Sequence, residues 1–503
     1  MICKKAKVLF IYLTPYKKTG VPIGLGSLCS VLKNNGHDVK IFDTAFYDLK
    51  KESYADKIRA DRKMSKRVVN EEGFFVEKYD LFEDLNNIIK EFKPNLICFS
   101  LIESFFFIST QIADYIKKKF KNIKIIAGGV FPTLSPEVVI NEKSIDIVCV
   151  GEGEIPLCNL CNNMMESKNI ENIEGLWVKK NGKVIRNKPH SLVDLNILPH
   201  PCFDYFDEKL FYKAMQGKLY KMVNIATDRG CPFQCSFCAA PTLKKIFDQN
   251  SCGKYYRKYD IKQVIKQLHY QIEKHNPEFI YFSSETFLGT SNKDFNIFIK
   301  EYDRIKLPFW FQTRFETISK ERIKKLKDIG MMWLTIGLEH GNERYRRNIL
   351  KRIYTNKLVL EKIKILADLR VGASINNVMG FPFENRELIF DTINLNKQIW
   401  EINNNIESNI FLFTPYMGCQ LREICVRENL IDKNNIVNTT QIDSDTILNF
   451  SESFKKELKG LLKTFNLYVK LPKEYYSQIC IAEKNDEEGN LMFNKLVAIL
   501  EES

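Results

Sequence analysis

The sequence lacks any apolar run long enough to cross a membrane. The longest apolar run near its start covers residues 8–13 and ends at Thr14 and Pro15. A membrane-spanning helix needs about 20 consecutive apolar residues, and the apolar core of a signal peptide needs about 7–15. No later run comes near the length of a span. We therefore expect a cytoplasmic protein with no membrane partner.

The sequence also lacks internal repeats, low-complexity tails and the dense cysteine framework of a small secreted protein. Its 14 cysteines are scattered along 503 residues, whereas disulfide scaffolds concentrate them in short chains. In a reducing compartment such cysteines are thiols or metal ligands. A chain of this length is too long for one hydrophobic core, so about two to four domains are expected.

The charge balance is moderately basic. Lys and Arg number 75 against 62 Asp and Glu, which gives a net charge of +13. Nucleic acid is one possible partner of a basic protein. Because the lysines are spread over many amphipathic helical patterns, solvated helix faces explain the charge better. We therefore do not expect a nucleic-acid partner.

Residues 1–165 alternate between strand-like and helix-like patterns. Helical patterns include one with Leu25, Cys29 and Leu32 on one face, which ends before Gly36. Apolar runs of strand length, rich in Val, Ile and Phe, occur at residues 8–13, 39–42, 96–100, 123–127 and 145–150. Runs that are apolar on both faces indicate buried parallel strands. This region is therefore predicted to form an α/β, doubly wound, Rossmann-like domain.

Residues 166–215 are predicted to form a hairpin followed by a linker. Asn181 and Gly182 are a turn signal inside the apolar pattern of residues 175–185, and this dipeptide favours a two-residue hairpin turn. The proline-containing stretch LNILPHP at residues 195–201 indicates the linker.

Residues 216–425 repeat the alternation of strands and helices. Strands are predicted at residues 223–226, 279–282, 309–313, 333–337, 373–379 and 409–414. Six strand–helix units predict a partial (β/α)6 barrel of the TIM type, which places its chemistry at the C-terminal strand ends. Polar residues stand at those ends, namely Asp228, Ser283, Glu285, Arg314, Glu339 and Thr414. Residues 426–503 are predicted to be mostly helical, and the apolar stripe over residues 454–465 is most simply core packing.

Three cysteines, Cys231, Cys235 and Cys238, follow the first barrel strand at the spacing C-x3-C-x2-C. By composition alone, about 0.01 such triads are expected in this chain. Three thiolates on one loop can hold three corners of a [4Fe–4S] cluster. No fourth cysteine follows at a regular interval, which leaves one iron open to bind a substrate. Zinc is the alternative, but structural zinc needs four ligands, and no further Cys or His pair lies nearby at finger spacing.

The segment TDRGCPFQCSFCA at residues 227–239 resembles the signature of the radical S-adenosylmethionine (SAM) superfamily. Later segments resemble that family's other motifs in order: FSSETF at 282–287, DIG at 328–330 with IGLEHG at 336–341, MGFPFE at 379–384, and TPYMG at 414–418. The resemblance covers about residues 215–425. It implies SAM contacts from Phe237, Ser283, Glu285, Arg314, Glu339, Gly380, Pro415 and Tyr416.

Three of these residues have a chemistry that suits contact with a particular group of SAM. Glu339 could hold the methionyl ammonium and Arg314 the carboxylate, while Gly380 would let the backbone approach adenine. Alternatively, Glu339 is an ion-pair partner in the barrel mouth and Arg314 a structural clamp. The sequence departs from the family pattern at three positions, namely Ser284 where an acid is common, Phe383 where glycine is common, and Cys419 where threonine is common.

The first domain resembles the cobalamin-binding domain found in front of many radical SAM enzymes. Glycine pairs end neighbouring strands in IAGGVFPT at residues 126–133 and VCVGEGE at 148–154, and such ends let backbone approach a large ligand. GLGSLC at residues 24–29 lacks the third glycine of a nicotinamide motif, so that cofactor is not expected. The resemblance covers about residues 5–215 and implies cobalamin contacts from Thr14, Pro15, Pro22, Gly24, Ser100, Gly128, Gly129, Thr133, Gly151, Glu152 and Gly153.

The D-x-H-x-x-G motif, which supplies a lower histidine ligand to cobalt in relatives, is absent. We therefore expect cobalamin to bind without a histidine ligand from the protein, and we interpret His37 as structural. The alternative is a domain that keeps this fold but has lost cobalamin.

The two-domain order resembles that of class B radical SAM methyltransferases. It implies an enzyme that uses a [4Fe–4S] cluster, SAM, cobalamin and an external electron donor such as flavodoxin or ferredoxin. The reaction so implied is methyl transfer to an unactivated carbon of a small-molecule or natural-product substrate, through a 5′-deoxyadenosyl radical and methylcobalamin. The alternatives are cyclisation, ring contraction or rearrangement without methyl transfer, an RNA-modifying enzyme, and a non-catalytic cobalamin sensor, against which the intact triad argues.

Overall fold

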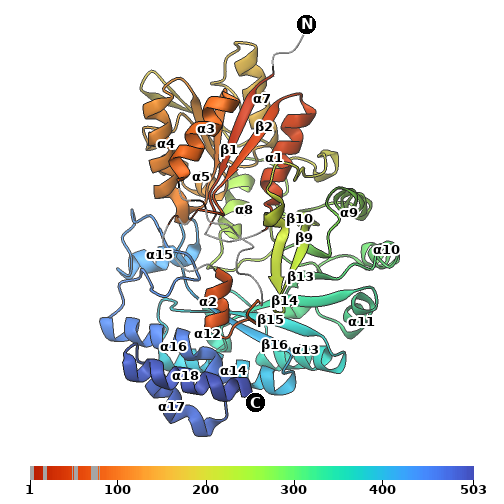
Figure 1. The fold of residues 1–503 in the computed structure, drawn as a ribbon, viewed down its shortest axis with the longest axis vertical. Coiled ribbons are helices and arrows are strands. Elements are labelled where there is room, and N and C mark those ends of the chain that lie inside the picture. Colours follow the sequence, from red (N-terminus) through yellow and green to blue (C-terminus); the bar gives the residue numbers. More distant parts are fainter. Residues whose placement is uncertain are drawn as a thin grey trace.

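The described residues form two seven-stranded sheets, each covered by helices, with a group of helices at the C-terminal end (Figure 1). The computed structural model describes residues 5–14, 20–47, 49, 55–68, 78 and 80–502. Among them, no helix combines the length and the apolar character that crossing a membrane requires.

The first sheet has the strand order β2-β1-β3-β4-β5-β6-β7. Its parallel strands are β1 (Lys7–Tyr12), β2 (Asp38–Asp43), β3 (Leu96–Ser100), β4 (Lys124–Gly128) and β5 (Ile147–Cys149). Helices α1 (Ile23–Asn34) and α7 (Glu154–Met165) pack in one hydrophobic cluster, while α3 (Leu81–Phe92), α4 (Phe106–Lys119) and α6 (Pro136–Asn141) pack in another. Helices on both faces of a parallel sheet confirm the predicted doubly wound fold.

The predicted hairpin is present as β6 (Leu176–Lys180) and β7 (Lys183–Arg186). Its turn residues Asn181 and Gly182 have φ of 49° and 75°, and a type I′ turn requires positive φ at both positions. The hairpin pairs antiparallel with β5. It therefore extends the first sheet.

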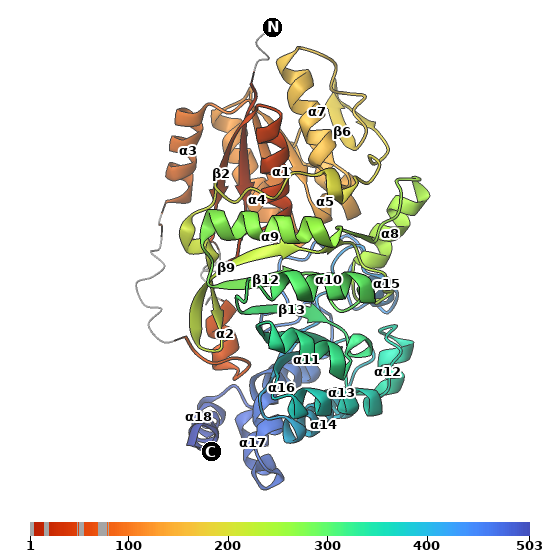
Figure 2. The ribbon, with the colours of Figure 1, turned by 90° about the vertical axis from the view of Figure 1, so that its right-hand side faces the viewer.

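The second sheet has the order β16-β15-β14-β13-β12-β9-β8. Its strands are β8 (Tyr212–Met215), β9 (Lys218–Ala226), β12 (Phe279–Ser283), β13 (Phe309–Thr313), β14 (Met331–Glu339), β15 (Gly372–Met379) and β16 (Ile406–Leu412). The six strands from β9 to β16 are parallel, whereas β8 is antiparallel to β9. Figure 2 shows the outer helices side by side, including α9 (Ile261–His275), α10 (Asn292–Tyr302), α11 (Lys320–Asp328) and α13 (Asn356–Asp368). This arrangement confirms the partial barrel, to which β8 adds a strand that was not predicted.

The C-terminal region is helical, as predicted. It contains α16 (Glu452–Lys470), α17 (Tyr476–Ala482) and α18 (Glu487–Glu502). The stripe on α16 is buried, with Leu461 and Phe465 fully inaccessible, and it packs in a cluster with residues of α14 (Arg386–Ile402) and β16. The stripe is therefore core packing.

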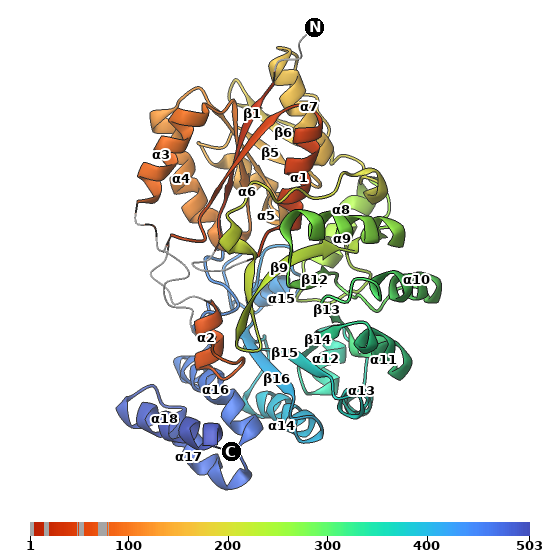
Figure 3. The same cartoon turned by 45° about the vertical axis from the view of Figure 1, so that its right-hand side comes forward.

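Residues 55–68, here called the crossing segment, leave the first sheet and reach the C-terminal helices. The segment begins with α2 (Ala55–Asp61), which lies beside the barrel in Figures 1 and 3. Met64 is fully buried in the α16 cluster. The Arg62 carbonyl accepts a hydrogen bond from Asn466 Nδ2 at 3.0 Å. The segment therefore packs a part of the chain near the N-terminus against the C-terminal helices.

The two sheets share one hydrophobic core. The largest hydrophobic cluster contains residues of β1 and α1 together with residues of β9, β12 and β13. Phe203, from the linker, fills the space beside Gly26, where a Cβ atom would lie 2.5 Å from the ring. This packing explains the glycine in the incomplete nicotinamide-like motif.

We predict that Met64→Ala destabilises the whole protein. Because its side chain is fully buried, the loss should lower the free energy of unfolding by about 2–5 kcal/mol. The matched control is Met332→Ala, since Met332 is exposed and its truncation should change stability by less than about 0.5 kcal/mol. Thermal and urea unfolding measure both. Equal unfolding midpoints for the two variants would contradict the packing of the crossing segment.

Candidate active site between the two sheets

The cysteine loop lies between β10 (Asp228–Arg229) and α8 (Ala240–Gln249). The Ser236 amide donates to the Leu350 carbonyl at 3.3 Å, and its carbonyl accepts from the Leu421 amide at 2.8 Å. Gly230 has φ of 80°, and a Cβ atom there would lie 2.5 Å from the Tyr255 carbonyl oxygen. The loop is therefore tied by its backbone to both sides of the barrel mouth.

The three thiols lie within electrostatic range of one another. Burial, together with the nearby charges of Glu285, Cys238 and Cys235, raises the pKa of Cys231 to about 12. Burial also raises the pKa of Cys238, together with Glu285 and Cys235. Iron binding therefore has to displace protons from Cys231 and Cys238. Among the described residues no three side chains already surround one metal position, but three cysteines on one loop supply the donor set for three corners of a [4Fe–4S] cluster.

Arg314 and Glu339 both lie at this loop. The Arg314 guanidinium stacks over the Phe233 ring at 3.7 Å, with Nη1 3.5 Å from the Cys235 sulfur. Glu339 ends β14 after a β-bulge and has φ of 67°. At Gly337 a Cβ atom would lie 2.2 Å from the Glu339 Oε1 atom, so glycine leaves room for this carboxylate.

Arg352 completes this group and was not among the predicted residues. Its Nη2 atom lies 3.0 Å from Glu339 Oε1, and its guanidinium lies 5.5 Å from the Phe237 ring centroid. Burial raises the pKa of Glu339, while the charges of Arg352 and Arg314 oppose that increase. Because Arg352 stands in an irregular stretch after α12 (Glu343–Asn348) and in no family motif, the sequence carried no signal for it.

Ser283 ends β12, and Glu285 follows it at the same end of the barrel. Burial raises the pKa of Glu285, and the negative charge of Asp228 adds to this, while Arg352 lowers it. The Ser284 hydroxyl donates a hydrogen bond to the Asp228 carboxylate. An acid at position 284, as in the family pattern, would therefore face the carboxylate of Asp228.

Gly380 and Tyr416 both take part in hydrogen bonds at the barrel mouth. The Gly380 amide donates to Glu384 Oε2 at 2.5 Å, with φ of 80° at the glycine. Tyr416, which follows Pro415, accepts a hydrogen bond at its hydroxyl from Ser104 Oγ at 3.1 Å. Because Ser104 belongs to the first domain, this side of the barrel mouth lies directly against that domain.

The predicted cobalamin residues that the structure describes gather at one edge of the first sheet. Four of them end or follow parallel strands, namely Thr14, Ser100, Gly128 and Gly151. The others named here lie where a helix begins at the same edge: Pro22 precedes α1 and Gly24 is in its first turn, while Glu152 and Gly153 precede α7. The Gly151 amide donates to the Thr133 hydroxyl at 3.0 Å, which links the segment after β5 to the short helix Val130–Leu134 that follows β4. Pro15 lies outside the described residues.

This edge suits a flat, apolar ring. Gly129 has φ of 113°, and a Cβ atom there would lie 2.8 Å from the Leu101 carbonyl oxygen. Beside it, Ile102 and Val130 are exposed by 45% and 39%. His37 stands at the opposite edge, where its Nδ1 atom accepts a hydrogen bond from the Ala6 amide at 3.3 Å. His37 is therefore structural.

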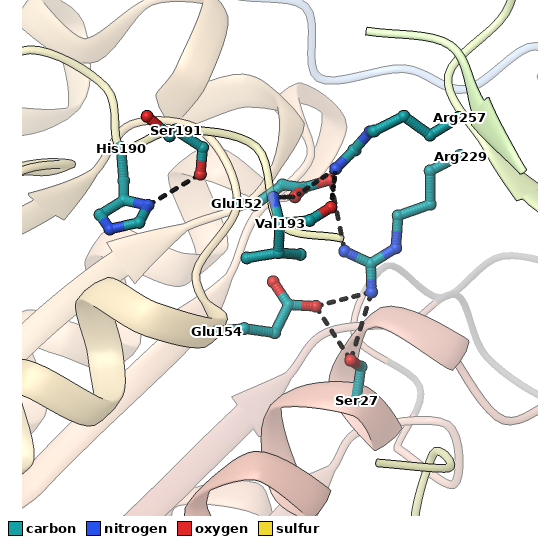
Figure 4. A network of polar contacts seen from close by, with 8 residues as sticks. All are labelled: Ser27, Glu152, Glu154, His190, Ser191, Val193, Arg229 and Arg257. Atoms are coloured by element: carbon teal, nitrogen blue, oxygen red, sulfur yellow. Dashed lines mark hydrogen bonds and ion pairs between the residues drawn. The ribbon is translucent and has the colours of Figure 1, made fainter. Parts of the chain in front are cut away.

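A buried network of charges connects the two domains beside the cysteine loop (Figure 4). Arg229 Nη2 lies 2.6 Å from Glu154 Oε1, and its Nη1 lies 3.3 Å from Glu152 Oε1. Arg257, from β11 (Arg257–Lys258), donates to Glu152 Oε2 at 3.2 Å. Ser27 of α1 donates to Glu154 at 2.9 Å. Burial alone would raise the pKa of Glu152, but Arg257 and Arg229 lower it overall.

Two family models match the chain. The radical SAM superfamily matches residues 225–395, and the B12 binding domain matches residues 11–161. The chain is 28% identical over 462 residues to an uncharacterized methyltransferase of Pyrococcus horikoshii, covering 90% of this chain and 89% of that protein. It is 21% identical over 351 residues to an anaerobic magnesium-protoporphyrin IX monomethyl ester cyclase of Cereibacter sphaeroides, covering 67% and 54%. The solved structure of the cobalamin-dependent SAM radical enzyme OxsB, with aqua-cobalamin and SAM bound, superposes with a TM-score of 0.64 at 15% identity, covering 99% of this chain and 72% of that one.

The fold and the site together define a class of protein. In it, the cysteine loop of a partial barrel lies next to the sheet edge of a doubly wound domain where the predicted cobalamin residues gather, here called the ligand edge. The chain is a radical SAM enzyme with a B12-binding domain, and its cofactors are a [4Fe–4S] cluster, SAM and cobalamin.

We predict that Cys231→Ala, Cys235→Ala and Cys238→Ala each abolish the bound cluster, since each would remove one of three iron ligands. Iron content and the thiolate-to-iron absorbance of anaerobically reconstituted protein measure this. The matched control is Cys419→Ala, because Cys419 is buried and the charge of Cys238 contributes to its raised pKa. It should keep its iron. A loss of iron in this control as large as in the triad variants would contradict a three-cysteine site.

We predict that Arg229→Met destabilises the protein by about 3–5 kcal/mol, because it leaves Glu154 buried without its cation. The control is Arg186→Met, which breaks an exposed pair with Glu137 and should cost less than about 1 kcal/mol.

The pH dependence of Arg229→Met provides a second readout. Since the folded-state pKa of Glu152 lies below its ordinary value of 4.5, its stabilisation is complete above that value and is lost as pH falls through the folded pKa. In the variant Glu152 loses one arginine, so its folded-state pKa should rise toward 4.5 and the unfolding midpoint should fall less as the pH is lowered. Identical acid profiles for wild type and variant would contradict the network.

Proposed function

We propose that this enzyme transfers a methyl group to an unactivated carbon of a small-molecule substrate. The observation that carries the proposal is the contact between the two sites: Arg229, two residues before Cys231, is paired with Glu152 and Glu154 at the ligand edge of the first domain. A radical generator and a methyl carrier are useful together only if both face one substrate. The similarity to a Pyrococcus horikoshii methyltransferase over most of both chains supports the same reaction.

The chain's own residues hold and orient the reactants. When bound, the cluster and cobalamin supply the electron that cleaves SAM and the carrier of its methyl group. Cys231, Cys235 and Cys238 ligate the iron. Glu339 accepts hydrogen bonds from the methionyl ammonium of SAM, and Arg352, 3.0 Å from that carboxylate, lowers its pKa against the effect of burial. Arg314, stacked on Phe233 beside Cys235, contacts the SAM carboxylate.

The remainder of the proposed SAM site is lined by Phe237, Ser283, Glu285, Gly380, Pro415 and Tyr416. At the first domain, the strand-end glycines let backbone approach the corrin, and no protein histidine coordinates the cobalt. Glu152 contributes by holding the domain edge in place, since arginines occupy its carboxylate. A flavodoxin or ferredoxin would supply electrons.

The second candidate is radical cyclisation or rearrangement without methyl transfer. The similarity to an anaerobic cyclase of Cereibacter sphaeroides favours it. RNA modification has less support, because residues 452–502 form helices α16 to α18 rather than a β-barrel module for RNA.

A single-turnover experiment separates these candidates. Protein reconstituted anaerobically with cluster and cobalamin, reduced and mixed with SAM, should form about one S-adenosylhomocysteine per bound cobalamin, because loading the methyl carrier needs no substrate. It should also form 5′-deoxyadenosine, which Cys231→Ala should abolish. Formation of 5′-deoxyadenosine without S-adenosylhomocysteine would contradict methyl transfer and favour the second candidate.

The same reduced sample reports on the lower ligand of cobalt. The electron paramagnetic resonance spectrum of bound cob(II)alamin should show no nitrogen hyperfine splitting that depends on a histidine of the protein. Splitting that disappears on substitution of any one of the 6 histidines would contradict histidine-free binding.

A further inference from the structure

Residues 343–353, here called the basic segment, carry a high density of positive charge at the mouth of the barrel. The segment consists of α12 and part of the irregular stretch that follows it, and it comes after β14, which ends at Glu339 of the proposed SAM site. In Figure 2, α12 lies at the edge of the molecule beside α13. The segment has one carboxylate, that of Glu343, and five cationic side chains, namely Arg344, Arg346, Arg347, Lys351 and Arg352.

Three of these cations face solvent without a counter-charge in contact. Arg344, Arg347 and Lys351 are exposed, and within the described parts of the chain none of them has a carboxylate oxygen within 4.0 Å. The Glu343 carboxylate is engaged elsewhere, because it accepts a hydrogen bond from the Asn356 amide at 2.6 Å at the start of α13. The exposed side of the segment is therefore a positively charged surface.

An apolar side chain stands among these cations. After α12, exposed and buried side chains alternate: Lys351 and Ile353 are exposed, whereas Arg352 and Tyr354 are buried. Arg352 reaches Glu339 of the proposed SAM site, and the Tyr354 hydroxyl donates to a backbone carbonyl of β14 at 3.0 Å. Because the buried pair faces the SAM site, Lys351 and Ile353 face away from it. Ile353 is 75% exposed, so it is available to a partner.

The basic segment is joined directly to the cysteine loop. The Ser236 amide donates to the Leu350 carbonyl at 3.3 Å, and the Ser236 hydroxyl donates to the Ile349 carbonyl at 2.5 Å. Ser236 follows the proposed iron ligand Cys235, and Leu350 precedes the exposed Lys351. Two hydrogen bonds therefore connect this surface to the neighbour of a cluster ligand.

The composition of the surface suits one kind of partner. Radical SAM enzymes need a reductant, and electron-transfer complexes have small interfaces, below about 1,200 Å². Unpaired positive charge speeds the approach of an acidic protein, and a single exposed isoleucine gives such a transient complex an apolar contact at its centre. A nucleic acid would also meet the cations, but it would use neither Ile353 nor the connection to Cys235.

We propose that the basic segment is the docking surface for the protein that reduces the cluster, and that this protein is an acidic one-electron carrier such as flavodoxin. This inference rests on the radical step of the proposed function, which needs a reduced cluster. The anionic flavin hydroquinone of the partner loses one electron and becomes the neutral semiquinone, and the oxidised cluster gains that electron. Carboxylates of the carrier pair with Arg344, Arg347 and Lys351, and the complex covers Ile353.

Comparison of two electron donors tests the surface. The holoenzyme, loaded with cluster, cobalamin and SAM, receives limiting flavodoxin hydroquinone or photoreduced 5-deazariboflavin, a small neutral donor that needs no docking surface. The rate of 5′-deoxyadenosine formation reports reduction of the cluster. With flavodoxin this rate should fall about tenfold as salt rises from about 0.05 M to about 0.5 M, because salt screens the attraction between charged surfaces. With 5-deazariboflavin it should stay constant.

A charge-reversal variant locates the docking surface. Arg347→Glu combined with Lys351→Glu should slow 5′-deoxyadenosine formation from flavodoxin by about tenfold or more, and leave the rate from 5-deazariboflavin unchanged. Ile353→Ser should raise the half-saturating flavodoxin concentration about tenfold. The matched control is Lys300→Glu combined with Lys364→Glu. Both lysines are exposed and lie toward the ends of α10 and α13 that lead into the next strand, at the opposite end of the barrel from the cysteine loop.

Four outcomes overturn the proposal: a flavodoxin rate that ignores salt, equal slowing by the docking variant and the control, equal slowing with both donors, or a flavodoxin rate that is unchanged in a docking variant that has lost binding to bulk RNA. The last outcome assigns the surface to nucleic acid. Failure of the proposed function has a different signature. If the donors and variants behave as expected but no S-adenosylhomocysteine forms, the surface serves a radical enzyme that does not transfer methyl groups.

Discussion

The arrangement of the active site depends on pairing one buried and one partly buried carboxylate from one domain with two arginines from the other. Glu152 and Glu154 stand at the ligand edge of the first sheet, and Arg229 and Arg257 stand on the strands beside the cysteine loop. If the domains moved apart, buried charges would be left without partners, which is among the most costly changes a folded protein can undergo. The network therefore fixes the distance between the cluster loop and the cobalamin edge, and a reaction that uses both cofactors requires that distance to be constant.

The contacts on the other side of the barrel mouth serve the same end. Glu103, in the first domain, accepts backbone hydrogen bonds from Met417 at 2.6 Å and from Val437 at 2.8 Å. Ser104 beside it binds the Tyr416 hydroxyl. The loop after the last barrel strand is thus attached to the domain that precedes the barrel. With the arginine network on the opposite side, the site is supported at two places.

The sequence predicted much of this structure where the signal was local. β3 and β13 have the predicted bounds because each begins with an unbroken apolar run, LICF at residues 96–99 and FWF at residues 309–311. The Asn181–Gly182 turn followed from the φ angles that these residues tolerate. The cysteine triad was predictable from its spacing alone. Strand β8, by contrast, is four residues stabilised by its pairing with β9, and the course of the crossing segment depends on residues hundreds of positions away. Arg352 belongs to no repeating pattern, and the role of Glu152 depends on arginines in another domain.

The crossing segment has a consequence for how this protein is made. A ribosome releases residues 55–68 early, yet Met64 packs among residues of α16, and Lys63 pairs with Glu501 at 2.7 Å. Domains commonly fold as they emerge during synthesis, but here the first domain has a segment whose packing partners are the last to leave the ribosome. Contacts between such distant parts of a chain slow folding. The crossing segment can therefore reach its final packing only after α16 and α18 have been synthesised.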